Sequence, residues 1–100
     1  MTRVLYTQDK NTFTLDVKGH AGYSEYGHDI VCAAISMLVH TLVEHMDKVA
    51  EDYECRMESG DVWIWAKGKD AVASAKTIMT GFIMLDHNFP EHVRISQRVS

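Results

Sequence analysis

The residues best suited to chemistry lie in one short segment, between positions 19 and 36. Asp29 immediately precedes an apolar helical pattern, so it is expected to cap that helix and to place Cys32 in its first turn. Unpaired backbone N–H groups and the helix dipole favour an anion there, which makes Cys32 a candidate thiolate nucleophile. A loop folded back on the helix would bring the His20 imidazole to the thiol, where its positive charge would lower the thiol pKa and its proton would pass to a leaving amine. Asp29 either orients that ring or serves only as the helix cap, and Ser36 lies one helical turn after Cys32 on the same face.

The same side chains admit two other interpretations. Cys32 is followed by two alanines, and a free cysteine in such a place is often a small core residue. His20, His28, Asp29 and Cys32 are also zinc-ligand types, but their spacing matches no standard zinc pattern. We therefore predict neither a metal nor a cofactor.

The connection from residue 19 to residue 28 is too long for a tight turn. It contains three glycines and two tyrosines, at Gly19, Gly22, Tyr23, Tyr26 and Gly27. Loops of this size in compact domains are often functional, so we expect this one to contact a ligand or substrate.

Hydrophobic periodicity predicts the elements that must position these residues. Strict alternation predicts strands and a 3-4 spacing predicts helices. The predicted elements are a hairpin of strands 3–7 and 12–18, a helix over about 30–49, a hairpin over 53–66, a helix capped by Asp70 and stopped at 88–90, and an edge strand over 93–99. The order ββαββαβ predicts an α+β domain, with a mostly antiparallel sheet and both helices packed on one face.

Several other side chains are expected to be structural. Cys55 is predicted to be a buried thiol, and Trp63 and Trp65 share a strand face that suggests a core or dimer contact. His92 flanks a turn and is predicted to be solvated. His40 forms no paired site with the other helix histidine, because the two point in different directions.

The composition of the chain excludes several classes of function. The chain has 100 residues, of which 46% are hydrophobic and 24% charged, as in a single globular domain spanning 1–100. Its formal net charge is −4 and it has no basic patch with interleaved aromatics, so no nucleic-acid partner is expected. No apolar run approaches a membrane span and no signal peptide is visible, which predicts a cytoplasmic protein with no membrane partner and with reduced cysteines.

The segments at residues 19–21 (GHA) and 27–36 (GHDIVCAAIS) resemble the signature of the bacterial ribosomal-processing cysteine protease Prp family. The family pattern is a G-H-A segment followed by a helix start like D-I-V-C-A-A-V-S. Ile35 stands where the family more often has valine, which is a conservative departure.

The resemblance implies a small homodimeric α+β endopeptidase. Such an enzyme removes an N-terminal extension from large-subunit ribosomal protein twenty-seven, with Cys32 as nucleophile and His20 as general base. Asp29 and Ser36 match further recurrent family positions with supporting roles. The loop glycines would let the loop close over an extended peptide, and its two tyrosines would contact that peptide.

A hypothesis from a different class remains open at this point. The chain would then be a non-catalytic, ribosome-associated peptide-binding module, with Cys32 as a core residue. Thiol reactivity distinguishes the two, because a core thiol resists alkylation in the folded protein.

Overall fold

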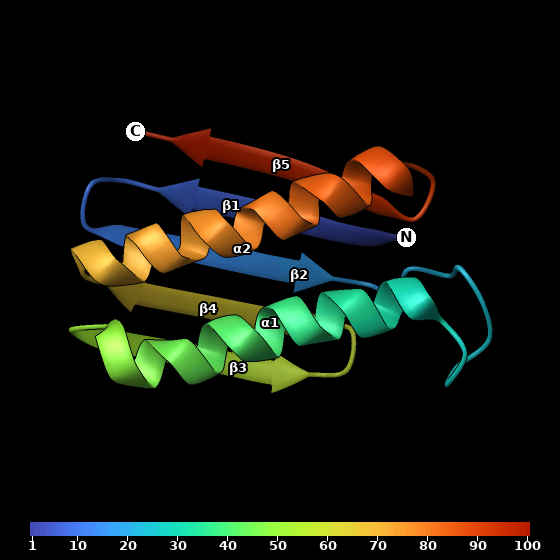
Figure 1. Ribbon diagram of the computed structural model, residues 1–100, viewed down its shortest axis with the longest axis horizontal. Coiled ribbons are helices and arrows are strands. Elements are labelled where there is room, and N and C mark those ends of the chain that lie inside the picture. The colour runs from blue at the N-terminus through green and yellow to red at the C-terminus, as the bar shows by residue number, and fades with distance from the viewer.

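The protein is a five-stranded sheet with two long helices on one face (Figure 1). The computed structural model describes all residues from 1 to 100. In chain order the elements are β1 (Thr2–Gln8), β2 (Thr12–Lys18), α1 (Ile30–Val49), β3 (Asp52–Glu58), β4 (Asp61–Lys67), α2 (Lys69–Asn88) and β5 (Val93–Val99). The strand order is β3-β4-β2-β1-β5, and only the β1–β5 pair is parallel. The predicted fold class and helix positions on one face are confirmed.

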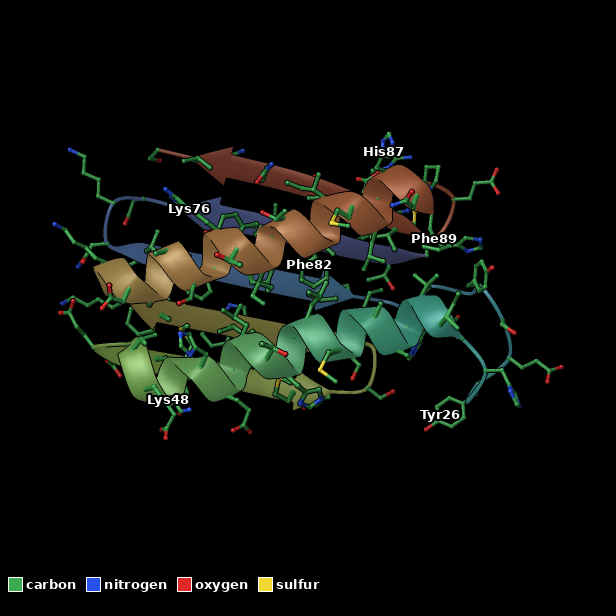
Figure 2. The ribbon with its side chains drawn as sticks, viewed as in Figure 1. Tyr26, Lys48, Lys76, Phe82, His87 and Phe89 are labelled. Carbon is green, nitrogen blue, oxygen red and sulfur yellow. The ribbon has the colours of Figure 1, made fainter.

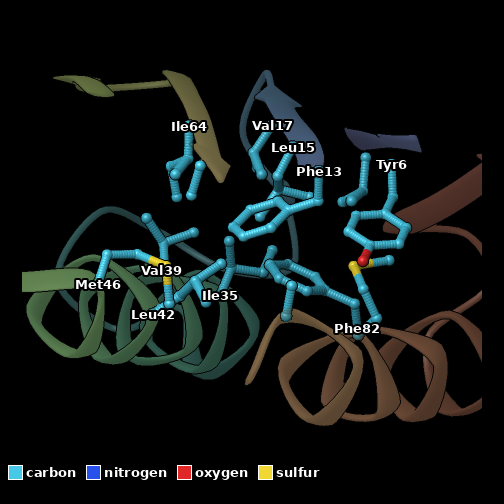
Figure 3. Close-up of a cluster of buried hydrophobic side chains, with 14 of the residues drawn as sticks. Tyr6, Phe13, Leu15, Val17, Ile35, Val39, Leu42, Met46, Ile64 and Phe82 are labelled. Carbon is cyan, nitrogen blue, oxygen red and sulfur yellow. The ribbon is translucent and has the colours of Figure 1, made fainter. Parts of the chain in front are cut away.

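The core lies between the sheet and the helices. Alternate residues of β1, β2 and β4 point toward α1 and α2, which present apolar stripes at helical spacing. Figure 3 shows side chains from the two layers meeting, among them Phe13 and Leu15 from the sheet and Leu42 and Phe82 from the helices. All four are at most 1% exposed. This single cluster fixes how the helices lie on the sheet.

Element boundaries follow the sequence closely, with one exception. α1 spans the predicted residues, and its cap is Asp29 as expected. The prediction that Asp70 caps α2 is wrong: the cap is Gly68, and no side chain bonds to this helix start. The Gly68 N–H instead donates to the Asn11 carbonyl at 2.7 Å, which ties the helix start to the β1–β2 turn. Asp70 lies in the first turn, where its charge still suits the helix dipole.

Two predictions of burial are corrected. Cys55 is exposed rather than buried, because β3 is an edge strand that α1 covers only in part. Trp63 and Trp65 alternate with the buried Ile64 and Ala66, so they lie on the sheet face away from the helices and are half-buried there. Of the two roles expected for these tryptophans, core or dimer contact, the core role is wrong.

The expectation that no apolar segment approaches the length of a membrane span does not hold for α1. Its length and composition would allow it to cross a membrane, and the core helix of a folded domain passes the same test. Here its buried face, which includes Val31, Val39 and Met46, packs in the core cluster.

Three segments far apart in the sequence meet at one end of the sheet. They are the end of β2 with the following loop, the start of α1, and the β3–β4 turn, at the right of Figure 1. The start of β1 and the α2–β5 connection lie at the same end. This end is where the candidate residues gather.

Replacing Phe82 by alanine tests the core assignment. We expect Phe82→Ala to lower the free energy of unfolding by about 3–5 kcal/mol, because it removes a fully buried ring and leaves a cavity. Urea unfolding measures the change. Ile83→Ala is the matched control, since the neighbouring side chain is 45% exposed and should cost well under half as much. Equal costs for the two variants would contradict this packing.

Candidate active site

A cleft of about 810 Å³ opens between α1, the loop after β2 and the β3–β4 turn. Its lining combines all three segments and one residue of β1. The lining residues are Thr2, Val17, Gly19, His20, Gly22, Ser24, Tyr26, Gly27, Asp29, Cys32, Ala33, Ile35, Ser36, Val39, His40 and residues 57–62. Cys32 and His20 therefore face one cavity, although twelve positions separate them in the sequence. Cys32 is half-buried and His20 is exposed.

Asp29 joins the loop to the helix through both of its carboxylate oxygens. Oδ1 accepts from the backbone N–H groups of Val31 at 3.0 Å and Cys32 at 2.9 Å, which is the helix cap. Oδ2 accepts from the N–H groups of Tyr23 at 2.9 Å and Ser24 at 3.2 Å. The recorded partners of this carboxylate are thus all backbone donors, and His20 is not among them. Of the two roles left open for Asp29, helix cap or orienter of His20, the structure shows the helix cap.

These hydrogen bonds also set the charge state of Asp29. Partial burial alone raises its pKa, but the backbone N–H groups of Cys32, Ser24 and Tyr23 lower it, and the Cys32 thiol adds a smaller lowering. The net pKa lies below the usual value of an aspartate, so the side chain is a carboxylate at neutral pH.

Because Asp29 occupies the start of α1, this helix end stabilises a thiolate at Cys32 less than a helix end without a bound anion would. Two of its N–H groups are already bonded to Asp29, whose negative charge offsets the positive end of the helix dipole beside Cys32. The Ala33 N–H donates to the Asp29 carbonyl at 3.1 Å. An oxyanion held by the Val31 or Cys32 N–H would therefore have to displace the carboxylate. Two imidazoles, those of His20 and His40, line the same cleft as Cys32.

His20 lies against the β3–β4 turn. Its backbone neighbour Gly19 donates an N–H to the Gly60 carbonyl at 2.9 Å, which extends the sheet by one contact beyond β2. A Cβ atom at position 60 would come within 2.7 Å of His20 Nε2. The absence of a side chain at Gly60 thus makes room for the imidazole.

Charged side chains hold the same turn. Asp61 Oδ1 accepts from the Lys18 ammonium and, at 3.1 Å, from the Arg56 guanidinium. Lys18 and then Arg56 as hydrogen-bond donors keep the pKa of Asp61 below its usual value. Lys18 immediately precedes Gly19, so this exposed ion pair ties the end of β2 to the turn that faces His20.

The predicted loop residues do not all reach the cleft. Gly19, Gly22 and Gly27 line it, as does Tyr26, whose fully exposed side chain lies below the start of α1 in Figure 2. Tyr23 does not line it. Its ring instead packs edge-on against Phe89 and His92, with ring centres 5.4 and 5.3 Å apart. The prediction that Tyr23 contacts substrate therefore has no support in this conformation.

Sequence reasoning missed parts of this site. Ser36 lines the cleft as expected, but so does His40, one turn further along α1. The 32, 36, 40 spacing was the available signal, since residues four apart share a helix face. The β3–β4 turn was read only as a hairpin connection, because nothing local in the sequence indicates what a turn faces. His92 is half-buried and bonded to the loop, not solvated as predicted.

Comparison with known proteins decides the family. The chain matches the family model of cysteine protease Prp over residues 1–94. The chain belongs to the cysteine protease Prp family. This membership makes it a cysteine protease and does not favour the non-catalytic alternative.

Solved structures share the Prp fold. The essential ribosomal processing protease Prp from S. aureus, with a covalently linked product peptide, has a TM-score of 0.86 and 23% identity, over 98% of this chain and 100% of that one. The same protein with a substrate peptide gives a TM-score of 0.81. SMU.848 from Streptococcus mutans gives 0.74 at 23% identity, over 100% of this chain and 96% of that one. A search of curated proteins finds no significant sequence match.

The zinc interpretation finds no geometric support. No group of three or more His, Cys, Asp or Glu side chains is arranged to hold a metal ion. Asp29, one of the four candidate ligands, is instead used by backbone N–H groups.

Two substitutions at position 29 separate its two roles. Asn caps helices about as well as Asp but cannot accept two further N–H bonds through its amide nitrogen. We expect Asp29→Ala to lower the free energy of unfolding by about 1 kcal/mol. Asp29→Asn should lose only a few tenths of a kcal/mol while freeing the amides of Tyr23 and Ser24 for faster hydrogen exchange. Equal exchange of these amides in Asp29→Asn and wild type would contradict the bridge.

The lowered pKa of Asp29 also makes the free energy of unfolding depend on pH in the acid range. Because the pKa of Asp29 is lower in the folded than in the unfolded chain, its contribution is complete above about pH 4 and disappears as pH falls through the folded value. Asp29→Asn, which does not titrate, should lose less stability over that acid range than wild type in urea unfolding.

Substitution of Gly60 tests its contact with His20. Gly60 has φ +68° and Gly27 has φ +86°, so alanine at either costs about 1–2 kcal/mol of backbone strain. A Cβ at position 27 meets nothing within 4 Å, whereas one at position 60 meets His20. Gly60→Ala should therefore shift the imidazole NMR resonances of His20, and Gly27→Ala should leave them in place. Unshifted resonances in Gly60→Ala would rule out this contact.

Proposed function

We propose that this protein is a ribosomal-processing endopeptidase, which removes the N-terminal extension of large-subunit ribosomal protein twenty-seven. Membership of the Prp family and the fold shared with the S. aureus ribosomal processing protease support the reaction class. The single observation that carries the proposal is that Cys32, in the first turn of α1, and His20, on the opposite wall, line one open cleft.

The first half of the reaction makes a covalent intermediate. His20 accepts the proton of the Cys32 thiol, and Sγ attacks the carbonyl carbon of the scissile bond. The carbonyl π electrons move to oxygen, which forms a tetrahedral oxyanion. As the carbon–oxygen double bond re-forms, the carbon–nitrogen bond breaks and His20 gives its proton to the leaving amine.

The second half regenerates the enzyme. His20 accepts a proton from water, whose oxygen attacks the thioester carbon. Collapse of this second tetrahedral intermediate breaks the carbon–sulfur bond, and the thiolate regains the proton from His20. The products are the extension with a new carboxylate and the ribosomal protein with a new amino terminus.

The cleft suits an extended peptide. It follows α1 from Cys32 to His40, about 12 Å along the helix axis, which matches three to four residues of extended chain. Val39 and Met57 give this stretch apolar walls. We propose that substrate side chains on one side of the scissile bond lie here, and that Tyr26 contacts substrate at the mouth of the cleft.

The open face of the sheet supports a proposal about assembly. Trp63, Trp65 and Leu5 lie on the face that the helices do not cover, and Leu5 is 49% exposed. Aromatic residues are enriched at interfaces between protein chains. We propose that the enzyme is a cytoplasmic, bacterial homodimer joined through this face, with no nucleic-acid or membrane partner.

Incubating the extended ribosomal protein with the enzyme tests the activity. Mass spectrometry should show one shortened product with wild type and none with Cys32→Ser, because serine is a far weaker nucleophile without a matched base. Cys55→Ser is the matched control, since it replaces the chain's other cysteine, an exposed thiol outside the cleft, and should cleave at the wild-type rate. His20→Gln should lower kcat by about 10²–10⁴-fold.

Either of two results would overturn the assignment. Full cleavage by Cys32→Ser would remove Cys32 from the mechanism. An intact substrate with wild type, alongside cleavage of another peptide, would leave the peptidase but reject the proposed substrate.

A further inference from the structure

A histidine outside the cleft is bonded to the residue that follows His20. Ala21 is 1% exposed, and its carbonyl oxygen lies 3.0 Å from Nδ1 of His92. Because a carbonyl only accepts, Nδ1 carries the proton and donates it. The two residues are 71 positions apart, and this contact is part-buried.

His92 is itself held firmly in the connection between α2 and β5. Its N–H donates to the Phe89 carbonyl at 2.9 Å, and its carbonyl accepts from the Thr2 N–H at 2.9 Å. On the other side its ring meets Tyr23 edge-on. The backbone of His92 is therefore bonded to the end of α2 on one side and to the start of β1 on the other, and these bonds fix the donor that its ring presents to Ala21.

His20 consequently lies between two anchored neighbours. Before it, the Gly19 N–H is bonded to the Gly60 carbonyl; after it, the Ala21 carbonyl is bonded to His92. Together the two bonds set the backbone direction from which the His20 side chain leaves. Beyond Ala21 the loop is exposed from Gly22 to His28, and its next bonds to the body of the protein are those of the Tyr23 and Ser24 N–H groups to Asp29.

We propose that His92 is a positioning residue for the reaction, which acts by holding the Ala21 carbonyl and so fixing the place of His20 in the cleft that Cys32 also lines. His92 does not line the cleft and touches no reacting atom. This inference rests on the proposed function, because it assigns a partner to the general base. Misplacing a catalytic group by about 1 Å can cost on the order of 10²-fold in rate.

Two substitutions at position 92 separate the hydrogen bond from the packing. His92→Asn keeps a donor, because the asparagine Nδ2 occupies nearly the position of the histidine Nδ1, but it loses the ring. His92→Phe keeps a ring against Tyr23 and loses the donor. His87→Phe is the matched control, on an exposed histidine of the last turn of α2.

The expected result is a split between the kinetic constants. His92→Phe should lower kcat by about 10–100-fold and change KM by no more than about threefold, since the cleft walls are intact. His92→Asn should restore kcat to within about threefold of wild type, and His87→Phe should leave both constants unchanged. Urea unfolding of each variant identifies any loss of kcat that comes from unfolded protein.

A structural readout distinguishes failure of this inference from failure of the proposed function. Hydrogen exchange at the Gly19 amide should be faster in His92→Phe than in wild type or His92→Asn, whether or not any substrate is cleaved. Wild-type kcat in a folded His92→Phe overturns the positioning role. If wild type cleaves no substrate, the proposed function fails, and unchanged exchange in His92→Phe then overturns the anchor as well.

Discussion

The arrangement of the site depends on one carboxylate, that of Asp29, which bonds to four backbone N–H groups on two segments. Through one oxygen it completes the first turn of α1 and fixes the residue that carries the thiol. Through the other oxygen it bonds the loop to the start of the helix. A charged acceptor suits this place, because each of these donors would otherwise need water, and charge-assisted bonds are about twice as strong as neutral ones.

That bridge removes part of the stabilisation that the helix start would give to Cys32, the proposed nucleophile. The same N–H groups that would stabilise a thiolate or an oxyanion are satisfied by a resident anion one turn away. In the free protein Asp29 thus occupies the N–H groups at the start of α1. A substrate oxyanion would compete with Asp29 for these donors. Asp29 therefore serves the shape of the site, and in the proposed mechanism proton transfer falls to His20.

Local patterns in the sequence predict most of the fold and part of the site. Period-2 alternation in residues 12–18 and the 3-4 spacing after Asp29 reproduce β2 and α1, because each depends on a face that the residue order itself defines. The Gly68 cap was missed, since its partner is the Asn11 carbonyl, 57 positions away. Tyr23 was misplaced for the same reason: its contacts are Phe89 and His92, which no spacing within the loop reveals.

The parallel pairing of β1 with β5 makes completion of the site depend on residues 93–99. Thr2 pairs with Val93 and Gln8 with Val99, so the first strand finds its second neighbour only when the last strand exists. Contacts of such large sequence separation form late and slowly in folding. A growing chain that ends before β5 can contain Cys32, His20 and Asp29 and still lack the edge against which β1 and the loop are aligned. Because synthesis runs from β1 toward β5, the site can be aligned in this way only after β5 has been made, which separates the synthesis of the site's residues from their assembly in time.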